Sequence, residues 1–183
     1  MRVIAGDYRG RILKSPPDAR TRPTSDRLRE TLFNIIAPRI VDSRFLDLCA
    51  GTGAVGIEAL SRGANHVTFV DRSRKMCALV RENLALCRVE KERLEIVTDE
   101  AAEFLKHTDS SFDIVFFDPP YSDDYLRVLS LFTHKKKLSE DSLLIIEHHR
   151  KNSLPDELDS LKKARIVRQG DSCLSFYKNV IQN

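Results

Sequence analysis

The apolar residues after position 44 fall into short continuous runs, and longer segments with helical spacing separate these runs. Continuous apolar runs are typical of parallel strands that are buried on both faces of a sheet. The alternation of strands and helices predicts right-handed crossovers, and therefore an α/β, Rossmann-like sheet with helices on both faces. We expect its parallel strands over residues 45–48, 66–70, 94–97, 113–117 and 143–146.

The last part of the chain has a different pattern. Strand-like runs over residues 164–168 and 173–177 flank Gln169-Gly170-Asp171, and no helix fits between them. Two strands joined so closely pair in antiparallel fashion. We therefore expect a mostly parallel seven-stranded sheet with a C-terminal antiparallel hairpin at its edge.

The N-terminal residues 1–43 are predicted to be a small extension packed on this sheet. Residues 3–13 alternate between apolar and polar around Asp7-Tyr8-Arg9-Gly10, which predicts two short strands and a turn. A proline-containing loop over residues 14–23 follows. The extension is therefore expected to begin with a hairpin that lies outside the main sheet.

A helix is predicted after this loop. The apolar residues between Leu28 and Ile36 recur with helical spacing, and Pro38 is expected to end the helix. Three residues in succession have side chains that can cap its N-terminus: Thr24, Ser25 and Asp26.

The composition sets limits on the class of protein. With 183 residues, 42% of them hydrophobic, the chain can form one compact domain, with a core over residues 44–183. It shows no apolar signal region and no membrane-spanning stretch, which predicts a cytoplasmic protein. No C-x-x-C pair is present, so we expect reduced thiols and no metal site. The cysteines are Cys49, Cys77, Cys87 and Cys173.

Basic residues are concentrated near the N-terminus, although the whole chain has a net charge of only +3. Residues 1–44 contain ten Lys or Arg against five Asp or Glu, and nine of the ten are Arg. Guanidinium groups pair bidentately with phosphate, so Arg9 and Arg11 are candidates to grip a nucleic-acid backbone. The alternative is a solvated charged surface.

The first candidate site follows the first predicted parallel strand. Residues 51–56 read Gly-Thr-Gly-Ala-Val-Gly, and this places a ligand at the carboxyl end of the strand, against Ala50, Gly51, Thr52 and Gly53. Dinucleotide enzymes share this glycine pattern. Asp47 shifts the interpretation, because a carboxylate repels a pyrophosphate but can accept hydrogen bonds from an ammonium. S-adenosylmethionine carries such an ammonium.

Acids also follow the next two strands. Asp71, with Arg72 beside it, lies about 20 residues after the glycines, where a carboxylate can hold the ribose hydroxyls of a cofactor. The segment Asp99-Glu100-Ala101 is expected to flank the adenine. The alternative for Asp99 and Glu100 is that either one caps the following helix.

The most specific motif is Asp118-Pro119-Pro120-Tyr121, which follows the fourth strand. The amine of a purine is a poor nucleophile because its lone pair is delocalised into the ring. Hydrogen bonds from its N–H groups to the Asp118 carboxylate and the Pro119 carbonyl can aim the lone pair at a methyl group, and this needs no metal. Tyr121 offers an aromatic face on which a base can stack. We interpret these four residues as a catalytic loop.

Three segments together resemble the bacterial 16S ribosomal RNA guanine-N2 methyltransferases, a class I S-adenosylmethionine-dependent family. They are residues 22–34, which begin Arg-Pro-Thr-Ser-Asp-Arg, residues 47–56 and residues 118–121. The resemblance runs almost end to end, and residues 22–34 distinguish this family from other amino-methyltransferases. It implies that the substrate is the N2 amine of guanine 966 in small-subunit ribosomal RNA.

The resemblance also implies roles for particular residues. Arg22 and Thr24 are expected near the cofactor, and Arg22 and Arg27 near the RNA. Counted back from Phe104, Glu100 matches the family's adenine-binding position better than Asp99. An assembling 30S particle with its ribosomal proteins is the expected partner, and nothing in the sequence requires more than a monomer.

Other functions are compatible with parts of this pattern. The Asp-Pro-Pro-Tyr loop is similar to that of adenine-N6 methyltransferases on DNA or RNA, which makes that activity the main alternative. A nicotinamide oxidoreductase would share only the glycine loop. An RNA-binding protein without catalysis would not need the intact Asp118 loop.

Overall fold

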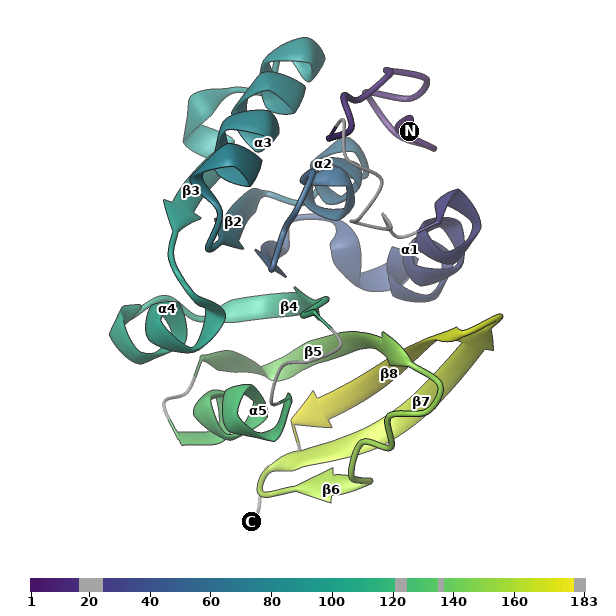
Figure 1. Cartoon of the computed structure of the whole chain (residues 1–183), viewed down its shortest axis with the longest axis vertical. Helices are drawn as coiled ribbons and strands as arrows, with labels where there is room; N and C mark the ends of the chain where they lie inside the picture. Colours follow the sequence, from purple (N-terminus) through teal and green to yellow (C-terminus); the bar gives the residue numbers. More distant parts are fainter. Residues whose placement is uncertain (17–24, 121–124, 135–136, 180–183) are drawn as a thin grey trace.

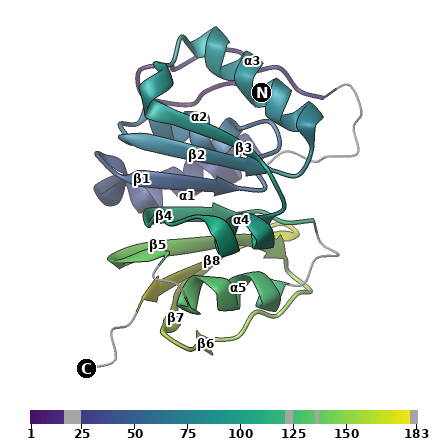
Figure 2. The ribbon, with the colours of Figure 1, turned by 90° about the vertical axis from the view of Figure 1, so that its left-hand side faces the viewer.

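Eight strands form one sheet with helices on both faces in the computed structural model, which describes residues 1–16, 25–120, 125–134 and 137–179 (Figures 1 and 2). Across these residues, no helix combines the length and the apolar character that crossing a bilayer requires. The helices are α1 (Asp26–Ile40), α2 (Ala54–Ser61), α3 (Arg74–Cys87), α4 (Ala101–His107) and α5 (Tyr125–His134), with a 3₁₀ turn over Lys91–Arg93.

The five predicted parallel strands are all present and are extended by one or more residues. The largest difference is in β5, which runs from Leu138 to His149 instead of covering only residues 143–146. The strands are β1 (Arg44–Leu48), β2 (His66–Asp71), β3 (Leu94–Thr98), β4 (Phe112–Phe117), β5 (Leu138–His149), β6 (Glu157–Leu158), β7 (Leu161–Gln169) and β8 (Ser172–Asn179).

The strand order is β3-β2-β1-β4-β5-β8-β7-β6. Strands β1 to β5 pair in parallel with one another, and β8 pairs antiparallel with both β5 and β7. The order reverses between β1 and β4, and ligands of open α/β sheets bind at such a switch point, beyond the carboxyl ends of the strands. The fold therefore places the candidate site where β1 and β4 end.

The C-terminal hairpin of β7 and β8 is confirmed, with one addition. In the described residues, the two-residue strand β6 pairs with β7 and becomes the edge, so the sheet has eight strands instead of seven. A strand this short carries no run of alternating residues, and this explains why the apolar pattern does not reveal it. Within the hairpin, β8 is the inner strand, between β5 and β7, and its residues are therefore buried continuously from Cys173 to Tyr177.

Each face of the sheet has its own hydrophobic core. One core contains Phe45, Phe116 and Ile145 and is covered by α1, α2, α3 and the N-terminal residues. The other contains Leu46, Phe117 and Ile146 and is covered by α4 and α5. Figure 1 shows the two sets of helices on opposite sides of the sheet. Side chains of neighbouring residues in a strand point to opposite faces, which is why both faces of these apolar runs are buried. We call these the α1 face and the α5 face.

The N-terminal extension is less regular than predicted. Instead of two strands, one isolated bridge pairs Arg2 with Ile12. The backbone N–H groups of Ile4 and Ala5 donate to the carboxylate of Glu58 in α2, at 2.8 and 3.0 Å. These contacts replace ladder hydrogen bonds, because the buried carboxylate satisfies two backbone donors at once.

Helix α1 begins at one of the predicted caps but ends later than predicted. Ser25 is the cap among the three candidates, since its side chain accepts from the N–H of Leu28 at 3.2 Å. The helix continues through Pro38 to Ile40 instead of ending there. Asn34 and Pro38 lie on the exposed face, so water can replace the hydrogen bond that proline lacks.

Candidate active site

Three carboxylates lie at the carboxyl edge of the sheet on its α1 face. Each comes two residues after an apolar residue of the core on that face: Asp47 after Phe45, Asp118 after Phe116 and Glu147 after Ile145. Leu48 is in register with Phe117, and Phe117 with Ile146, so the three strands end side by side. The N–H of Asp118 donates to the carbonyl of Leu48 at 3.3 Å. The sheet thus brings together three acids that are far apart in the sequence.

The electrostatics of this group are unusual because its members share the same sign. Burial raises the pKa of Asp118 well above its ordinary value, and the nearby charges of Glu147 and Asp47 raise it further. Burial likewise raises the pKa of Asp47 to about 7, although a backbone hydrogen bond from Gly56 opposes this. Such a group favours ligands that bring positive charge or N–H donors.

The glycine loop makes a sharp turn after β1. Cys49, Gly51 and Gly53 have φ angles of 68°, 54° and 75°, in the left-handed region. The N–H groups of Cys49 and Ala50 both donate to the carbonyl of Val70 at 2.9 Å, which anchors the loop to the end of β2. A Cβ atom on Gly51 would meet no atom within 4 Å, so a ligand can approach the backbone there. Thr52 is buried beneath this turn.

Asp47 joins the strand to the start of α2. Its Oδ2 atom accepts from the N–H of Gly56 at 2.8 Å, in the first turn of the helix. A Cβ on Gly56 would come within 2.3 Å of the Phe69 ring, so α2 can pack closely on β2 only with glycine at this position. The third glycine of the motif is therefore explained by helix packing.

Asp71 connects the same loop to the next helix. Its two carboxylate oxygens accept from the N–H of Gly51 and the N–H of Ser73, both at 2.8 Å. These bonds fix the carboxylate at the carboxyl edge beside the glycine loop, while the residue keeps partial exposure and Arg72 next to it is exposed. Its contact with ribose stays a prediction.

The segment after β3 lies next to Asp71. The N–H of Asp99 donates to the carbonyl of Asp71 at 3.2 Å, and the N–H of Glu100 donates to the Asp99 carboxylate at 2.8 Å. Glu100 occupies the N-cap position of α4 but makes no side-chain cap bond, and Ala101 begins the helix. Neither carboxylate is thus seen capping an amide inside α4. The choice between Asp99 and Glu100 as the adenine contact stays open.

These residues fit S-adenosylmethionine. The loop offers open backbone at Gly51, and Asp47 and Asp71 offer acceptors for an ammonium and for hydroxyl groups. The like-charged acids would repel the pyrophosphate of a dinucleotide. The acceptors and the open backbone therefore match a cofactor that carries a cationic amino-acid part and an adenosine part.

Some predicted residues fall outside the described ranges. These are Tyr121 of the catalytic loop and Arg22 and Thr24 of the segment before α1. Within the described residues, Pro119 is buried and Pro120 is exposed at the end of β4. Arg27 is exposed on the first turn of α1.

Arg9 and Arg11 lie apart from the three acids. The N–H groups of Asp7 and Tyr8 donate to Ser61, the last residue of α2, while the glycine loop lies at the first. The eight residues of this helix are about 12 Å long. Arg11 lies near Cys87, the last residue of α3, where it partly offsets the raising effect of burial on the pKa of that thiol. Their role in RNA binding stays a prediction.

The sequence analysis missed Glu147 and the buried pair of Arg29 and Glu58. Glu147 is only 5% exposed, next to Asp118 across the sheet. Alternation along β5 places Glu147 on the same face of the sheet as Leu143 and Ile145. This signal points to the site only when the strand order is also known. Arg29 Nε lies 3.8 Å from Glu58 Oε2, with both side chains fully buried. No apolar pattern signals such a pair.

The strand order, the glycine loop at the switch point and the Asp-Pro-Pro segment after β4 define a Rossmann-like class I methyltransferase domain. The sequence pattern of the family described as "Conserved hypothetical protein 95" matches residues 1–178, and the chain belongs to this family.

Relatives of known name agree with this assignment. The chain is 39% identical over 156 residues to ribosomal RNA small subunit methyltransferase D of Escherichia coli, covering 85% of this chain and 78% of the relative. It is 37% identical over 182 residues to YlbH of Bacillus subtilis, covering 97% and 98%. The solved structure of Escherichia coli yhhF superposes with a TM-score of 0.88 at 35% identity, covering 100% of this chain and 99% of the other.

Proposed function

We propose that this protein transfers a methyl group from S-adenosylmethionine to the exocyclic N2 amine of a guanine in small-subunit ribosomal RNA. The related Escherichia coli protein is named as a small-subunit ribosomal RNA methyltransferase, and this supports the substrate class. The family resemblance suggests guanine 966 as the target.

The observation that carries the choice of guanine is the adjacent pair of Asp118 and Glu147. The Watson–Crick edge of guanine presents two neighbouring donors, N1–H and the N2 amine, whereas the same edge of adenine presents one donor and one acceptor. Two carboxylates side by side are complementary to two donors. They would leave the N1 acceptor of adenine facing a negative charge, and a site built for hydrogen bonds rejects such a mismatch strongly.

The residues at the end of β4 would do most of the catalytic work. S-adenosylmethionine, when bound, supplies a methyl group on a positively charged sulfur. The Asp118 carboxylate and the Pro119 carbonyl accept the two N–H groups of the amine and orient its lone pair. Asp118 can then take the proton that the methylated nitrogen loses, and its raised pKa makes it a better base for that step. Tyr121 would stack on the base.

Residues around the glycine loop would hold the cofactor. Asp47 and the backbone of Gly51 suit its amino-acid part, and Asp71 suits the ribose hydroxyls. Asp99 or Glu100 would accept a hydrogen bond from the adenine amine. Because burial raises the pKa of Asp47 to about 7, an ammonium bound beside it would favour its ionised form.

Nucleoside mass spectrometry tests the proposal directly. Small-subunit RNA from a strain that lacks the gene is incubated with purified protein and S-adenosylmethionine, with a second sample lacking the cofactor as control. Gain of one N2-methylguanosine per RNA is the expected result. Gain of N6-methyladenosine instead would replace this proposal with the adenine alternative, and no methylated nucleoside on RNA or on assembled subunits would refute both.

We further propose that a partly assembled small subunit is the preferred substrate. The net charge of +3 is small for a protein that must bind a large polyanion unaided. Initial rates on free RNA and on reconstituted particles, compared at equal concentration, test this. A faster reaction on free RNA would contradict it.

A further inference from the structure

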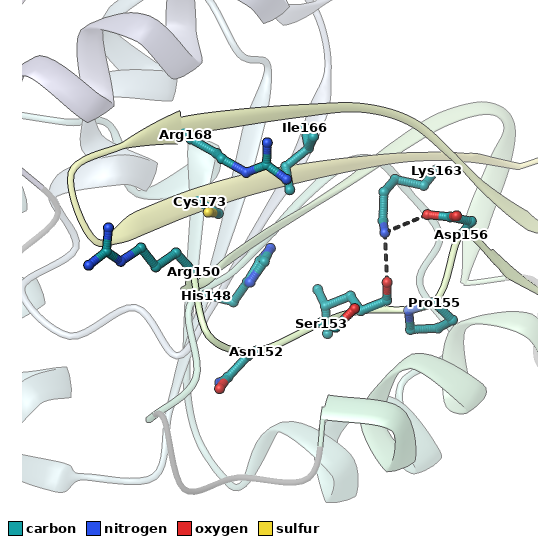
Figure 3. A pocket seen from close by; sticks show the side chains of 11 residues that line it. His148, Arg150, Asn152, Ser153, Pro155, Asp156, Lys163, Ile166, Arg168 and Cys173 are labelled. Carbon is teal, nitrogen blue, oxygen red and sulfur yellow. Dashed lines mark hydrogen bonds and ion pairs between the residues drawn. The ribbon is translucent and has the colours of Figure 1, made fainter.

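A cavity lies at the same edge of the sheet as the candidate active site, but on the opposite face. Its volume is about 430 Å³, and it lies between β5, β8, β7 and the segment of residues 150–156 (Figure 3). Glu147 and His148 are neighbours in β5, so their side chains point to the α1 face and the α5 face respectively. One strand therefore contributes to the active site and to this cavity through consecutive residues.

A row of three side chains crosses the floor of the cavity. His148 is paired with Cys173 in β8, and Cys173 with Arg168 in β7, so all three lie on the α5 face. The His148 ring is held in place, with Nε2 2.9 Å from Ser175 Oγ and Nδ1 3.1 Å from the His149 carbonyl. Both ring nitrogens therefore have partners within the protein, and the histidine forms part of the floor.

The wall opposite the sheet is fixed by Lys163 and Tyr177. Lys163 Nζ donates to the carbonyl of Leu154 at 2.6 Å and pairs with Asp156 at 2.9 Å. The Tyr177 hydroxyl donates to the carbonyl of Pro155 at 2.6 Å. These bonds hold the segment over the cavity in one position. Figure 3 shows the two that Lys163 makes, which use its charge. A cavity with fixed walls loses little entropy when a ligand binds.

Arg168 differs from the other cations of the cavity. Arg150 pairs with Asp171 at 3.0 Å, as Lys163 pairs with Asp156. In the part of the chain that the structure describes, the Arg168 side chain has neither a hydrogen bond nor an ion pair. Its guanidinium is exposed and lines the cavity. It therefore retains its full set of donors for a ligand, and the charge of the cavity is positive.

We propose that this cavity binds a phosphate of the RNA backbone, with Arg168 as its principal ligand and Arg150 beside it. This rests on the proposed function, because RNA would be the substrate at Asp118. The acids of the active site repel phosphate, so a nucleotide can enter only if cations nearby attract the backbone. Arg168 and Arg150 lie at the carboxyl edge where the base would enter, whereas Arg9 and Arg11 lie toward the other ends of α2 and α3.

The salt dependence of RNA binding tests the proposal. The probe is an unmethylated transcript of small-subunit ribosomal RNA, and its affinity is measured at several salt concentrations. Arg168→Ala should weaken binding roughly three- to tenfold near 0.1 M salt, and should reduce the slope of log K against log salt by about 0.7 to 0.9. Arg168→Lys should recover most of the slope because it restores the charge.

Arg165 provides the matched control. It is an exposed arginine on the same strand, paired with Phe176 and therefore on the α1 face. Arg165→Ala removes the same charge from the protein and should leave both affinity and slope close to wild type. Equal losses in the two variants would overturn the proposal, since only net charge would then matter, and so would wild-type behaviour of Arg168→Ala or an absence of measurable binding by the wild type.

Methylation measured in parallel separates this proposal from the proposed function. Binding that depends on Arg168, without methyl transfer to guanine, would support the cavity and refute the reaction. Guanine methylation with no effect of Arg168→Ala on binding would support the reaction and refute the cavity. Unchanged thermal unfolding of each variant would show that the exposed arginines can be replaced without loss of the fold.

Discussion

Charged side chains are buried in two regions of this protein, and the two regions differ in how the charge is balanced. Under the N-terminal extension, Glu58 accepts from Ile4 and Ala5 and pairs with Arg62 at 2.8 Å, with Arg29 on its other side. At the ends of β1, β4 and β5 on the α1 face, the charged groups are all carboxylates: Asp47 and Glu147 are buried, and Asp118 is half-buried.

This difference separates a structural use of buried charge from a chemical one. In the first group the Glu58 carboxylate is balanced by two arginines and two backbone donors of the chain itself, and it joins α1, α2 and the N-terminus. In the second group burial and like charge raise the pKa of Asp118. This arrangement is costly for folding and is typical of functional sites. Raised pKa values in a group of like charges are therefore a better guide to the site than burial of charge alone.

The largest expected effect is on the reaction. Asp118→Ala removes the acceptor that orients the amine, and we expect methyl transfer to fall by about a thousandfold while cofactor binding persists. Initial rates and calorimetric titration with S-adenosylmethionine measure the two properties. Asp113→Ala is the control, because Asp113 is in the same strand but pairs with Arg44 at the other end. Near-normal turnover by Asp118→Ala would exclude a catalytic role for this residue.

The next largest effect is on stability in the other region. Glu58→Ala leaves the buried Arg29 with Asp26 as its remaining carboxylate partner and frees two backbone donors, and we expect a loss of about 3–5 kcal/mol in the free energy of unfolding. Urea unfolding measures this. Glu30→Ala, on the exposed side of α1, should cost less than about 0.5 kcal/mol. Similar losses in both variants would show that the pair contributes little.

A smaller effect concerns the pH dependence of stability. Because the pKa of Asp47 is about 7 in the folded protein and 3.8 ordinarily, the folded state retains a proton that the unfolded chain releases. This stabilisation is present in full below about pH 4 and is lost as pH rises through about 7. Asp47→Asn keeps an acceptor for Gly56 but cannot titrate.

Between about pH 5 and about pH 8, the free energy of unfolding of the wild type should therefore fall by roughly 2 kcal/mol more than that of Asp47→Asn. Asp109→Asn, at an exposed position, should behave like the wild type. If Asp47→Asn followed the wild-type pH dependence, Asp47 would not be the group responsible.

The smallest effect is on base selection. Glu147→Gln replaces an acceptor pair by one acceptor and one donor, and the preference for guanine over adenine should fall roughly tenfold. Removing the charge also lowers the pKa of Asp118, so the rise of activity with pH should move to lower pH. Competition between guanine and adenine substrates and a pH–rate profile measure these changes. An unchanged preference would remove Glu147 from base recognition.

Much of the fold was predictable because local patterns determine it. The runs ending at Leu48, Val70 and Phe117 identified three parallel strands, and the motif after each run placed a candidate segment at the carboxyl edge of the sheet. The Ser25 cap follows from the same kind of local rule.

The remaining features depend on contacts between distant residues. Ile4 and Glu58 are 54 positions apart, and nothing in either segment indicates that a carboxylate replaces a strand partner. Glu147 is placed beside Asp118 only by the register between β4 and β5. The cavity near Arg168 needs the order β5-β8-β7, in which β8, later in the chain than β7, lies between the other two.

Because the side chains of Glu147 and His148 lie on opposite faces of the sheet, the length of the segment before them in β5 is constrained. Deleting or inserting one residue within β5 upstream of them would exchange the two side chains between faces, so that an imidazole entered the active site and a carboxylate entered the cationic cavity. Both effects would follow from a single codon, without any change in the residues themselves. The segment of residues 150–156, which follows β5, has no such constraint from strand alternation. Length variation among relatives should therefore be found after His149 and be absent between Leu143 and Glu147, in keeping with the paired register there.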